Sequence, residues 1–428
     1  LFYFFVDLKG LAPAAIGLML LITKLVDALT DPMMGILADR TNSRWGRYRP
    51  YLLFGAVPFG FCGVLVFAAP SLNAQETLIW AYVTYTLAML AYTAVNVPYG
   101  GLLGVISPSN IERGNVAVYR MFFSALAGIL IGIFGTTLVR ELGGVDEARG
   151  IMLTMGVIAV ISIFCLLTTF LTTKERIPIK ASQGEIAADI KELLQTGPWI
   201  AIAIAAILGV TAISCRQASS LFFFEYVAGD DGIPVFGFFD RIALFLTALA
   251  IGQISGIFLS NFLQRRFEKS HLVISAGLLK SVAIMLFYAA PLDAFWLQTT
   301  VQYIVGVGFG MLMVLAFSMF TDISEFVDWR SNKLMTGLVV SASIFAVKAG
   351  VAFGLAIPGF VMGLTGFEAG IDQTENAKFG IDLAFSIIPA AMLLPGGIVL
   401  LFYRLDRQTL ATIEIELAER RKVLAKST

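Results

Sequence analysis

Charge, cysteine and histidine are all scarce in this sequence. Of its 428 residues only 14% are Asp, Glu, Lys or Arg, three are Cys and one is His. A soluble domain carries roughly 25% charged residues, so the composition argues against a soluble enzyme. The cysteines lie singly in apolar runs, which argues against a disulfide framework or a zinc site. The 30 basic and 30 acidic residues cancel, so no nucleic-acid partner is expected.

Long apolar runs take the place of the missing charge, since 58% of the residues are hydrophobic and the mean hydropathy is +0.83. A bilayer-spanning helix needs about 20 mostly apolar residues. Backbone amides in lipid must bond internally, so a chain of such runs predicts an all-α membrane protein. The first run begins at Leu1 in an aromatic stretch, and we expect the chain to start inside its first membrane helix. The predicted spans are 1–8 (a stub), 12–38, 50–70, 76–106, 116–139, 150–173, 198–226, 238–263, 271–290, 295–320, 334–364 and 380–403.

The longest polar interruption separates six predicted spans from six. A faint repeat relates the two sets, because Gly35 and Arg44 are nine residues apart, as are Gly256 and Arg265. Two six-helix halves around a central site are typical of transporters. We therefore predict an N-terminal half (1–173), a cytoplasmic linker with a short interfacial helix (174–197), a C-terminal half (198–404) and a charged tail (405–428).

The basic residues predict the orientation of the chain in the membrane. Loops on one side, together with the linker and the tail, hold 20 Lys and Arg, whereas the opposite loops hold five. Cytoplasmic loops carry the excess of basic residues. We therefore place both termini in the cytoplasm and expect the inner membrane of a bacterium as the location.

The loop from Gly35 to Arg47 carries a signature. Its letters, G-I-L-A-D-R-T-N-S-R-W-G-R, closely match the G-x-L-A-D-R-x-x-x-x-G-R pattern of the major facilitator superfamily, with one more residue before the final G-R. An acidic side chain here can meet the arginines or a helix N-terminus and so lock one conformation of a rocking bundle. We expect these residues to gate transport without touching the substrate. The predicted gating residues are Asp39, Arg40, Arg44 and Arg47.

Two carboxylates lie one helical turn apart in the second span. Asp27 and Asp31 are spaced i, i+4 and so share one face of the helix. Carboxylates inside hydrocarbon are costly unless they hold a cation, protons or a basic partner. Thr30 could add an oxygen ligand, because hard cations take oxygen. The sequence therefore predicts a Na⁺ or H⁺ site, while a salt bridge from Lys24 to Asp27 stays open as the simpler alternative.

Several strings occur in an order that is typical of one family. Asp27-Ala-Leu-Thr-Asp31-Pro32-x-x-Gly35 is followed by Arg44-Trp45-Gly46-Arg47-Tyr-Arg49-Pro50. Together they resemble the glycoside–pentoside–hexuronide:cation symporters, and the resemblance spans essentially the whole chain. Further matching strings are Ala91-Tyr92-Thr93-Ala-Val-Asn96-Val97-Pro98-Tyr99, Tyr119-Arg120-Met-Phe-Phe, Asp322-Ile-Ser-Glu325-Phe-Val-Asp328-Trp329 and Lys348-Ala-Gly350.

The resemblance implies a twelve-helix major facilitator fold, with the first helix truncated here. It also implies uptake of a sugar or glycoside coupled to Na⁺ or H⁺ by alternating access. By matching position, the cation site would comprise Asp27, Asp31 and Thr93 with Lys348 nearby, and the sugar contacts would be Arg120 and Asn96.

The sequence departs from the family pattern at three positions. Asn96 stands where the family has an aspartate, and Gly100 and Met313 stand where it has tryptophans that stack on sugar. The family's first-helix aspartate would precede residue 1. Specificity for galactosides is therefore not implied.

The charges inside the spans suggest a property of the substrate. Lys280 could lie on a helix away from the cavity, and we set it aside. The remaining bases outnumber the acids, and an uncompensated buried charge is expensive. An acidic sugar (hexuronide-like or sulfonated), clamped by Arg216 or Arg120, would restore the balance, but a neutral glycoside fits equally well. The four candidate substrate-binding bases are Lys24, Arg120, Arg216 and Lys348, and the two acids are Asp27 and Asp31.

Two other functions deserve comparison with cation-coupled sugar symport. One is a carrier of related fold for a lysolipid or another amphiphile, and the other is a membrane receptor that does not transport. No phosphate loop, catalytic carboxylate cleft or nucleophile elbow is visible, so we expect neither an enzyme nor a cofactor beyond the coupling ion. The expected partners are the substrate, Na⁺ or H⁺ and the lipid bilayer, and we expect a monomer.

Overall fold

The computed structural model describes residues 1–427, except 71, 108–109, 177–190, 230–234, 236–239 and 332–335. Eleven of the described helices are long and apolar enough to cross a membrane, which confirms the all-α membrane class. The predicted stub forms a short π-helix, η1 (Phe4–Leu8). The predicted interfacial helix of the linker lies largely outside the described residues.

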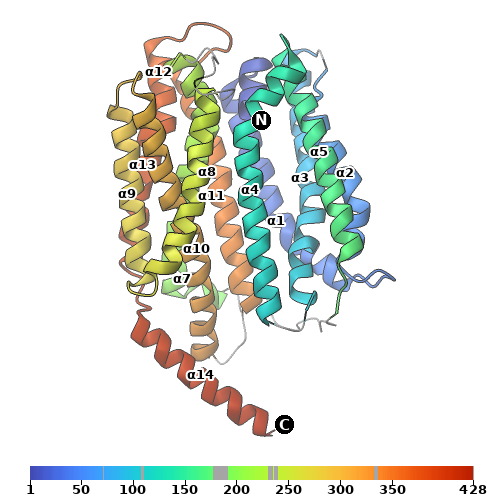
Figure 1. The fold of residues 1–428 in the computed structure, drawn as a ribbon, viewed down its shortest axis with the longest axis vertical. Coiled ribbons are helices and arrows are strands. Elements are labelled where there is room, and N and C mark those ends of the chain that lie inside the picture. Colours follow the sequence, from blue (N-terminus) through green and yellow to red (C-terminus); the bar gives the residue numbers. More distant parts are fainter. Residues whose placement is uncertain are drawn as a thin grey trace. The chain divides into compact units, whose positions relative to one another are not determined.

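The helices follow the predicted apolar runs, as the ribbon in Figure 1 shows. The last predicted span is divided into α12, η3 and α13, and the tail forms α14. The bounds are α1 (Pro13–Arg40), α2 (Arg49–Phe67), α3 (Ala74–Val105), α4 (Asn110–Gly143), α5 (Glu147–Thr172), α7 (Gly197–Phe222), η2 (Phe223–Val227), α8 (Arg241–Leu263), α9 (Lys269–Ala289), α10 (Phe295–Ser331), α11 (Thr336–Thr365), α12 (Glu375–Asp382), η3 (Leu383–Ile387), α13 (Ile388–Leu400) and α14 (Arg407–Ser427).

Local sequence explains where several helices begin. Pro13 and Pro50 lie in the first turns of α1 and α2, where a missing backbone N–H costs nothing. Asn73 and Glu76 form a capping box at the start of α3. In the same way, the Asp146 side chain accepts the N–H of Arg149 at the start of α5. Such caps satisfy amide groups that the first helical turn leaves unpaired.

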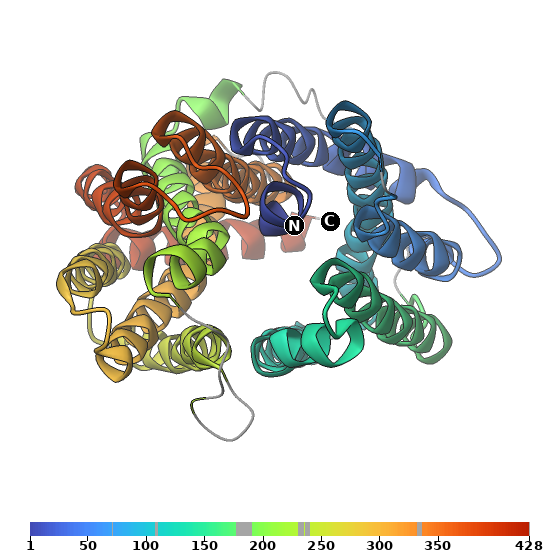
Figure 2. The same cartoon turned by 90° about the horizontal axis from the view of Figure 1, so that it is seen from above.

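The chain forms two compact units. Unit 1 comprises 1–182, 218–247 and 355–384. Within it α2 packs against α3 and α5, α1 packs against α3, and α4 packs against α5. Figure 2 shows these five helices end-on, side by side. Unit 1 thus contains the whole predicted N-terminal half together with two segments of the predicted C-terminal half.

Aromatic contacts and hydrogen bonds explain why the two later segments belong to unit 1. The Phe222 ring lies 5.3 Å from that of Phe2 and 5.4 Å from that of Phe367. The Tyr226 hydroxyl donates to Asp7 and accepts the N–H of Gly370. Segments 218–247 and 355–384 therefore pack with the start of the chain. The six-plus-six division by sequence stays a prediction.

Unit 2 comprises 183–217, 248–354 and 385–428. In it α8 and α10 cross closely: a Cβ added at Gly256 would lie 2.0 Å from the carbonyl oxygen of Val307, and one at Gly310 would lie 2.0 Å from that of Gln253. Small residues permit such approach of membrane helices. The tail helix α14 packs on α10 and buries Ile413 and Leu417.

Candidate cation and substrate site

Two carboxylates of α1 and one hydroxyl of α3 meet inside unit 1. The Thr93 hydroxyl donates to Asp27 Oδ1 at 2.6 Å and lies 3.3 Å from Asp31 Oδ1. Asp27 and Thr93 are each 2% exposed, and Asp31 is half-buried. Three side chains that the sequence singled out therefore come together as a compact group of oxygens. Oxygen is the ligand that hard cations take.

The other predicted members of this site make different contacts. The Thr30 hydroxyl donates its proton to the backbone carbonyl of Asp27 at 3.0 Å, within its own helix. The Lys24 ammonium lies 3.1 Å from the sulfur of Met89 on α3. Lys24 is half-buried, one turn before Asp27 on α1. A basic side chain thus stands beside the carboxylate pair.

A cavity of about 230 Å³ opens between α2, α3 and α5 of unit 1. Asn96 lines it, as do the neighbouring Tyr92 and Tyr99. Aromatic walls with a few polar groups are typical of small-molecule sites. The guanidinium of Arg120 stacks on the Tyr99 ring, 4.7 Å from its centre. The remaining lining residues are Phe59, Val95, Ser162, Cys165 and Leu166.

Arg216 lies on α7 in unit 2 and is completely buried. Its Nε donates to the Gln302 side chain at 3.1 Å, and Nη1 donates to the Phe385 carbonyl at 2.8 Å. The rings of Phe287 and Phe385 lie 4.6 and 4.0 Å from the guanidinium carbon. Partners from its own unit therefore hold this arginine, and it offers no exposed surface to a ligand in this conformation.

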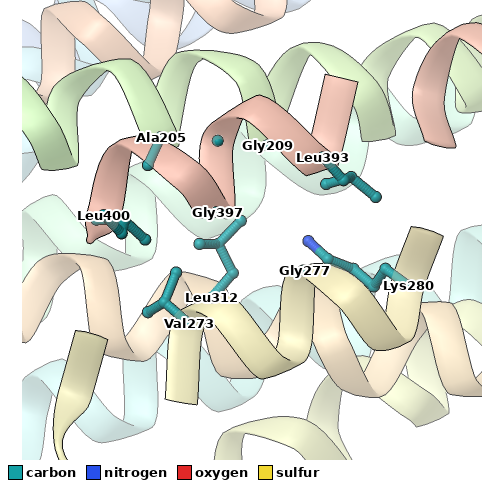
Figure 3. Close-up of a pocket in the computed structure, with 10 residues that line it drawn as sticks. Ala205, Gly209, Val273, Gly277, Lys280, Leu312, Leu393, Gly397 and Leu400 are labelled. Carbon is teal, nitrogen blue, oxygen red and sulfur yellow. The ribbon is translucent and has the colours of Figure 1, made fainter. Parts of the chain in front are cut away.

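Two lysines of unit 2 differ in their surroundings. Lys348 is half-buried on α11. Lys280 on α9 is only 3% exposed, and its nitrogen points between α9 and α13 among small and apolar residues (Figure 3). The cavity beside it measures about 20 Å³, room for about one water molecule. No hydrogen bond or ion pair joins Lys280 to any residue that the structure describes.

The signature loop joins α1 to α2. Asp39 accepts a hydrogen bond of 2.6 Å from the Tyr48 hydroxyl. Burial and this bond raise the pKa of Tyr48 well above its usual range. Arg44 stacks 4.0 Å from the Trp45 ring centre, and Arg40 is exposed. Asp39 thus bonds a tyrosine, whereas we expected the arginines or a helix N-terminus as its partner.

Sequence reasoning missed the residue that does meet a helix N-terminus. The carboxylate of Glu175, just after α5, accepts the backbone N–H groups of Arg47, Tyr48 and Arg49 at 2.9, 2.8 and 3.1 Å. These amides precede and open α2, whose N-cap residue makes no side-chain cap of its own. Glu175 stands in the string Lys-Glu-Arg, which resembles an ordinary solvated linker.

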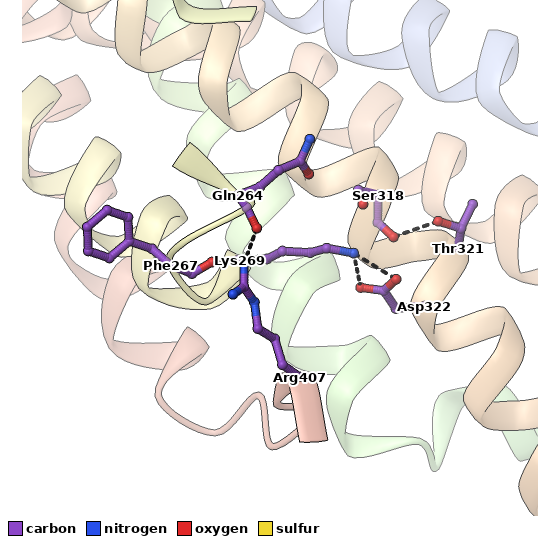
Figure 4. Close-up of polar contacts among 7 residues, drawn as sticks. All are labelled: Gln264, Phe267, Lys269, Ser318, Thr321, Asp322 and Arg407. Atoms are coloured by element: carbon purple, nitrogen blue, oxygen red, sulfur yellow. Dashed lines mark hydrogen bonds and ion pairs between the residues drawn. The ribbon is translucent and has the colours of Figure 1, made fainter. Parts of the chain in front are cut away.

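One end of unit 2 carries an ion pair near α14 (Figure 4). The Lys269 ammonium lies 2.8 and 2.6 Å from the two carboxylate oxygens of Asp322. Arg407, the first residue of α14, donates to the backbone carbonyls of Gln264 and Phe267. The acidic string that begins at Asp322 is therefore tied to the start of α9.

Comparisons with known proteins identify the family. The model of the family described as MFS/sugar transport protein matches residues 1–407. The chain belongs to this family. The resemblance to glycoside–pentoside–hexuronide:cation symporters is thereby confirmed, and the family consists of transporters, not enzymes. The chain is an integral membrane protein, and the receptor alternative loses its basis.

Two curated relatives from Escherichia coli (strain K12) align over nearly the whole chain. The inner membrane symporter YicJ is 29% identical, over 97% of this chain and 89% of its own. The putative glycoside/cation symporter YagG is 30% identical, over 98% of this chain and 90% of its own. Among solved structures, an inward-facing bacterial homologue of the human lysosomal transporter Spinster has a TM-score of 0.70 at 15% identity, covering 94% of this chain and 93% of its own. This likeness confirms the major facilitator fold.

Proposed function

We propose that this member of the sugar transport family couples the movement of a glycoside to that of Na⁺ or H⁺. The observation that carries the proposal is the buried group of Asp27, Asp31 and Thr93. Carboxylates in a membrane helix are costly unless a cation, protons or a basic partner neutralises them, and the three oxygens gathered here favour a cation or protons. The relative YagG, which is named a putative glycoside/cation symporter, supports both the substrate class and the coupling.

Coupling follows if the cation and the sugar favour each other's binding. Neutralising Asp27 and Asp31 would remove negative charge from the membrane interior and so favour the conformation that binds sugar, and linkage makes this effect reciprocal. The halves would then rock and release both ligands on the other side. The relative YicJ is named an inner membrane symporter, which supports the same location and symport here.

The test is uptake of a labelled glycoside into proteoliposomes under imposed Na⁺ and pH gradients. Accumulation above equilibrium that follows one of these gradients is expected. Asp27→Asn and Asp31→Asn should abolish accumulation while leaving exchange of sugar across the membrane without a gradient. Gradient-driven accumulation by either variant at the level of the native protein would refute the coupling role.

A finer proposal concerns the charge of the substrate. Arg120 is exposed, and its guanidinium lies against the ring of Tyr99, which also lines the cavity with Asn96. A guanidinium binds a carboxylate or sulfonate through paired donors. We propose Arg120, and not the enclosed Arg216, as the clamp for an acidic sugar, with Lys24 as a further basic contact; a role of Lys348 in substrate binding stays a prediction.

Matched substrates decide between an acidic and a neutral sugar. A hexuronide and the corresponding neutral hexoside should be compared as substrates of the native protein and of Arg120→Gln. A rise in KM of about tenfold or more for the hexuronide alone is expected, because one charge-assisted contact is lost. Equal KM changes for both substrates would leave a neutral glycoside as the better description.

A further inference from the structure

Glu175 and the signature loop are far apart in sequence but bonded in space. Glu175 lies 126 to 128 residues along the sequence from the three residues whose backbone N–H groups donate to its carboxylate. Backbone N–H groups at a helix start carry partial positive charge, so a carboxylate is favoured there. Here that carboxylate comes from the end of another membrane helix. The contact therefore fixes α5 to the start of α2 at one point.

The loop is shaped around this carboxylate. Gly46 has φ +106°, and a Cβ at this position would lie 2.4 Å from Glu175 Oε1 and 2.5 Å from its Cδ. A side chain at residue 46 would thus meet both backbone strain and the carboxylate. Gly46, the glycine of the G-R pair in the signature, accordingly leaves room for the Glu175 carboxylate.

Neighbouring contacts join the same two elements. Arg49 donates from Nη2 to the Phe170 carbonyl at 2.6 Å and stacks on the Phe170 ring. The N–H of Arg176 donates to the Val105 carbonyl, at the end of α3, at 2.8 Å. The end of α5 is thus bonded to α2 and to α3 on either side of Glu175. The loop that carries Arg44 and Arg47 cannot move relative to the segment that follows α5 without breaking bonds to Glu175.

We propose that Glu175 is a positioning residue for transport: its charge holds the signature loop in the geometry from which the gating residues act. This inference rests on the transport function proposed above. Glu175 contacts neither the proposed cation site of Asp27, Asp31 and Thr93 nor the cavity lined by Asn96. Its loss should therefore slow the conformational cycle and leave substrate affinity intact. The predicted result is a lower Vmax for uptake at an almost unchanged KM.

Glu175→Gln tests the charge, because it keeps the size of the side chain. Hydrogen exchange of the backbone amides of residues 47–49 should become about tenfold faster or more, since three charge-assisted bonds weaken. In Glu175→Asp, whose side chain is one methylene shorter, the exchange rate should lie between those of Glu175→Gln and the native protein. Gly46→Ala, a change on the loop side of the same contact, should also accelerate exchange of these amides. Glu414→Gln, the same change at an exposed site on α14, is the matched control.

Two results would overturn the proposal. If exchange of these amides is unchanged in Glu175→Gln, the carboxylate does not hold the loop. If exchange accelerates but Vmax stays at the native value, Glu175 only supports the local structure. The exchange measurement needs no substrate, so it tests the loop contact even if the native protein transports no glycoside. A lack of glycoside transport by the native protein would count against the proposed function and not against this contact.

Discussion

Removing the Thr93 hydroxyl from the proposed cation site of Asp27, Asp31 and Thr93 should change the cation requirement of transport more than any other property. Thr93 donates to Asp27 at 2.6 Å and lies 3.3 Å from Asp31. Thr93→Val keeps the shape of the side chain and replaces only the hydroxyl by a methyl group. The two carboxylates then lose the donor that joins them, and a bound cation loses a ligand.

The size of the effect follows from the geometry. A buried hydrogen bond to a charged group contributes about 1.5–3 kcal/mol, and about 1.4 kcal/mol corresponds to a factor of ten in an equilibrium constant. The loss of the Thr93 hydroxyl should therefore raise the cation concentration for half-maximal uptake by about tenfold or more. The sugar KM at saturating cation should stay close to the native value, because the variant acts on the cation step.

The assay is the initial rate of glycoside uptake against the concentration of the coupling ion. Thr84→Val is the matched control, since Thr84 is a buried threonine on the same helix whose hydroxyl donates to the carbonyl of Trp80 in its own helix. The control should keep the native cation dependence. An unchanged half-maximal concentration in Thr93→Val, or the same shift in Thr84→Val, would refute the reasoning.

Three further variants test stability and one contact of unit 1. Arg216→Ala should lower the free energy of unfolding by about 3 kcal/mol, because two hydrogen bonds and two ring contacts are lost; an unchanged unfolding midpoint in detergent would contradict this. Lys280→Met should leave the midpoint unchanged or raise it, since an apolar residue suits an apolar site, and a clear fall would reveal a buried partner. Tyr226→Phe should cost about 1–3 kcal/mol through its bond to Asp7, which thermal unfolding can measure against Tyr288→Phe, a change at an exposed tyrosine.

Hydropathy alone predicted most of the fold. The run 76–106 became α3 (Ala74–Val105), and the run 271–290 became α9 (Lys269–Ala289). Each helix must form its backbone hydrogen bonds internally within the membrane. The hydropathy of a span therefore depends only on its local sequence and can be read from it. The packing of 218–247 and 355–384 with the start of the chain was not predictable, because it depends on rings and hydroxyls that meet only after folding.

The candidate site was predictable only in part, for the same reason. The i, i+4 spacing placed Asp27 and Asp31 on one face, but Thr93 entered through the family resemblance alone. Arg216 lies in an apolar run, and sequence cannot tell whether such an arginine meets a ligand or is held by its own neighbours. Glu175 is charged, near other charges and distant in sequence from its three amides, so no periodic pattern marks it.

The aromatic contacts of Phe222 with Phe2 and Phe367 have a consequence for biosynthesis. When a membrane protein is inserted as it is made, the first five helices emerge long before residues 218–247 and 355–384. The faces that these later segments cover in unit 1 must therefore stay in contact with lipid or an assisting factor until most of the chain has been synthesised. A chain interrupted after residue 182 would leave the ring of Phe2 without its contact to Phe222, and degradation of such fragments in the membrane is the expected outcome.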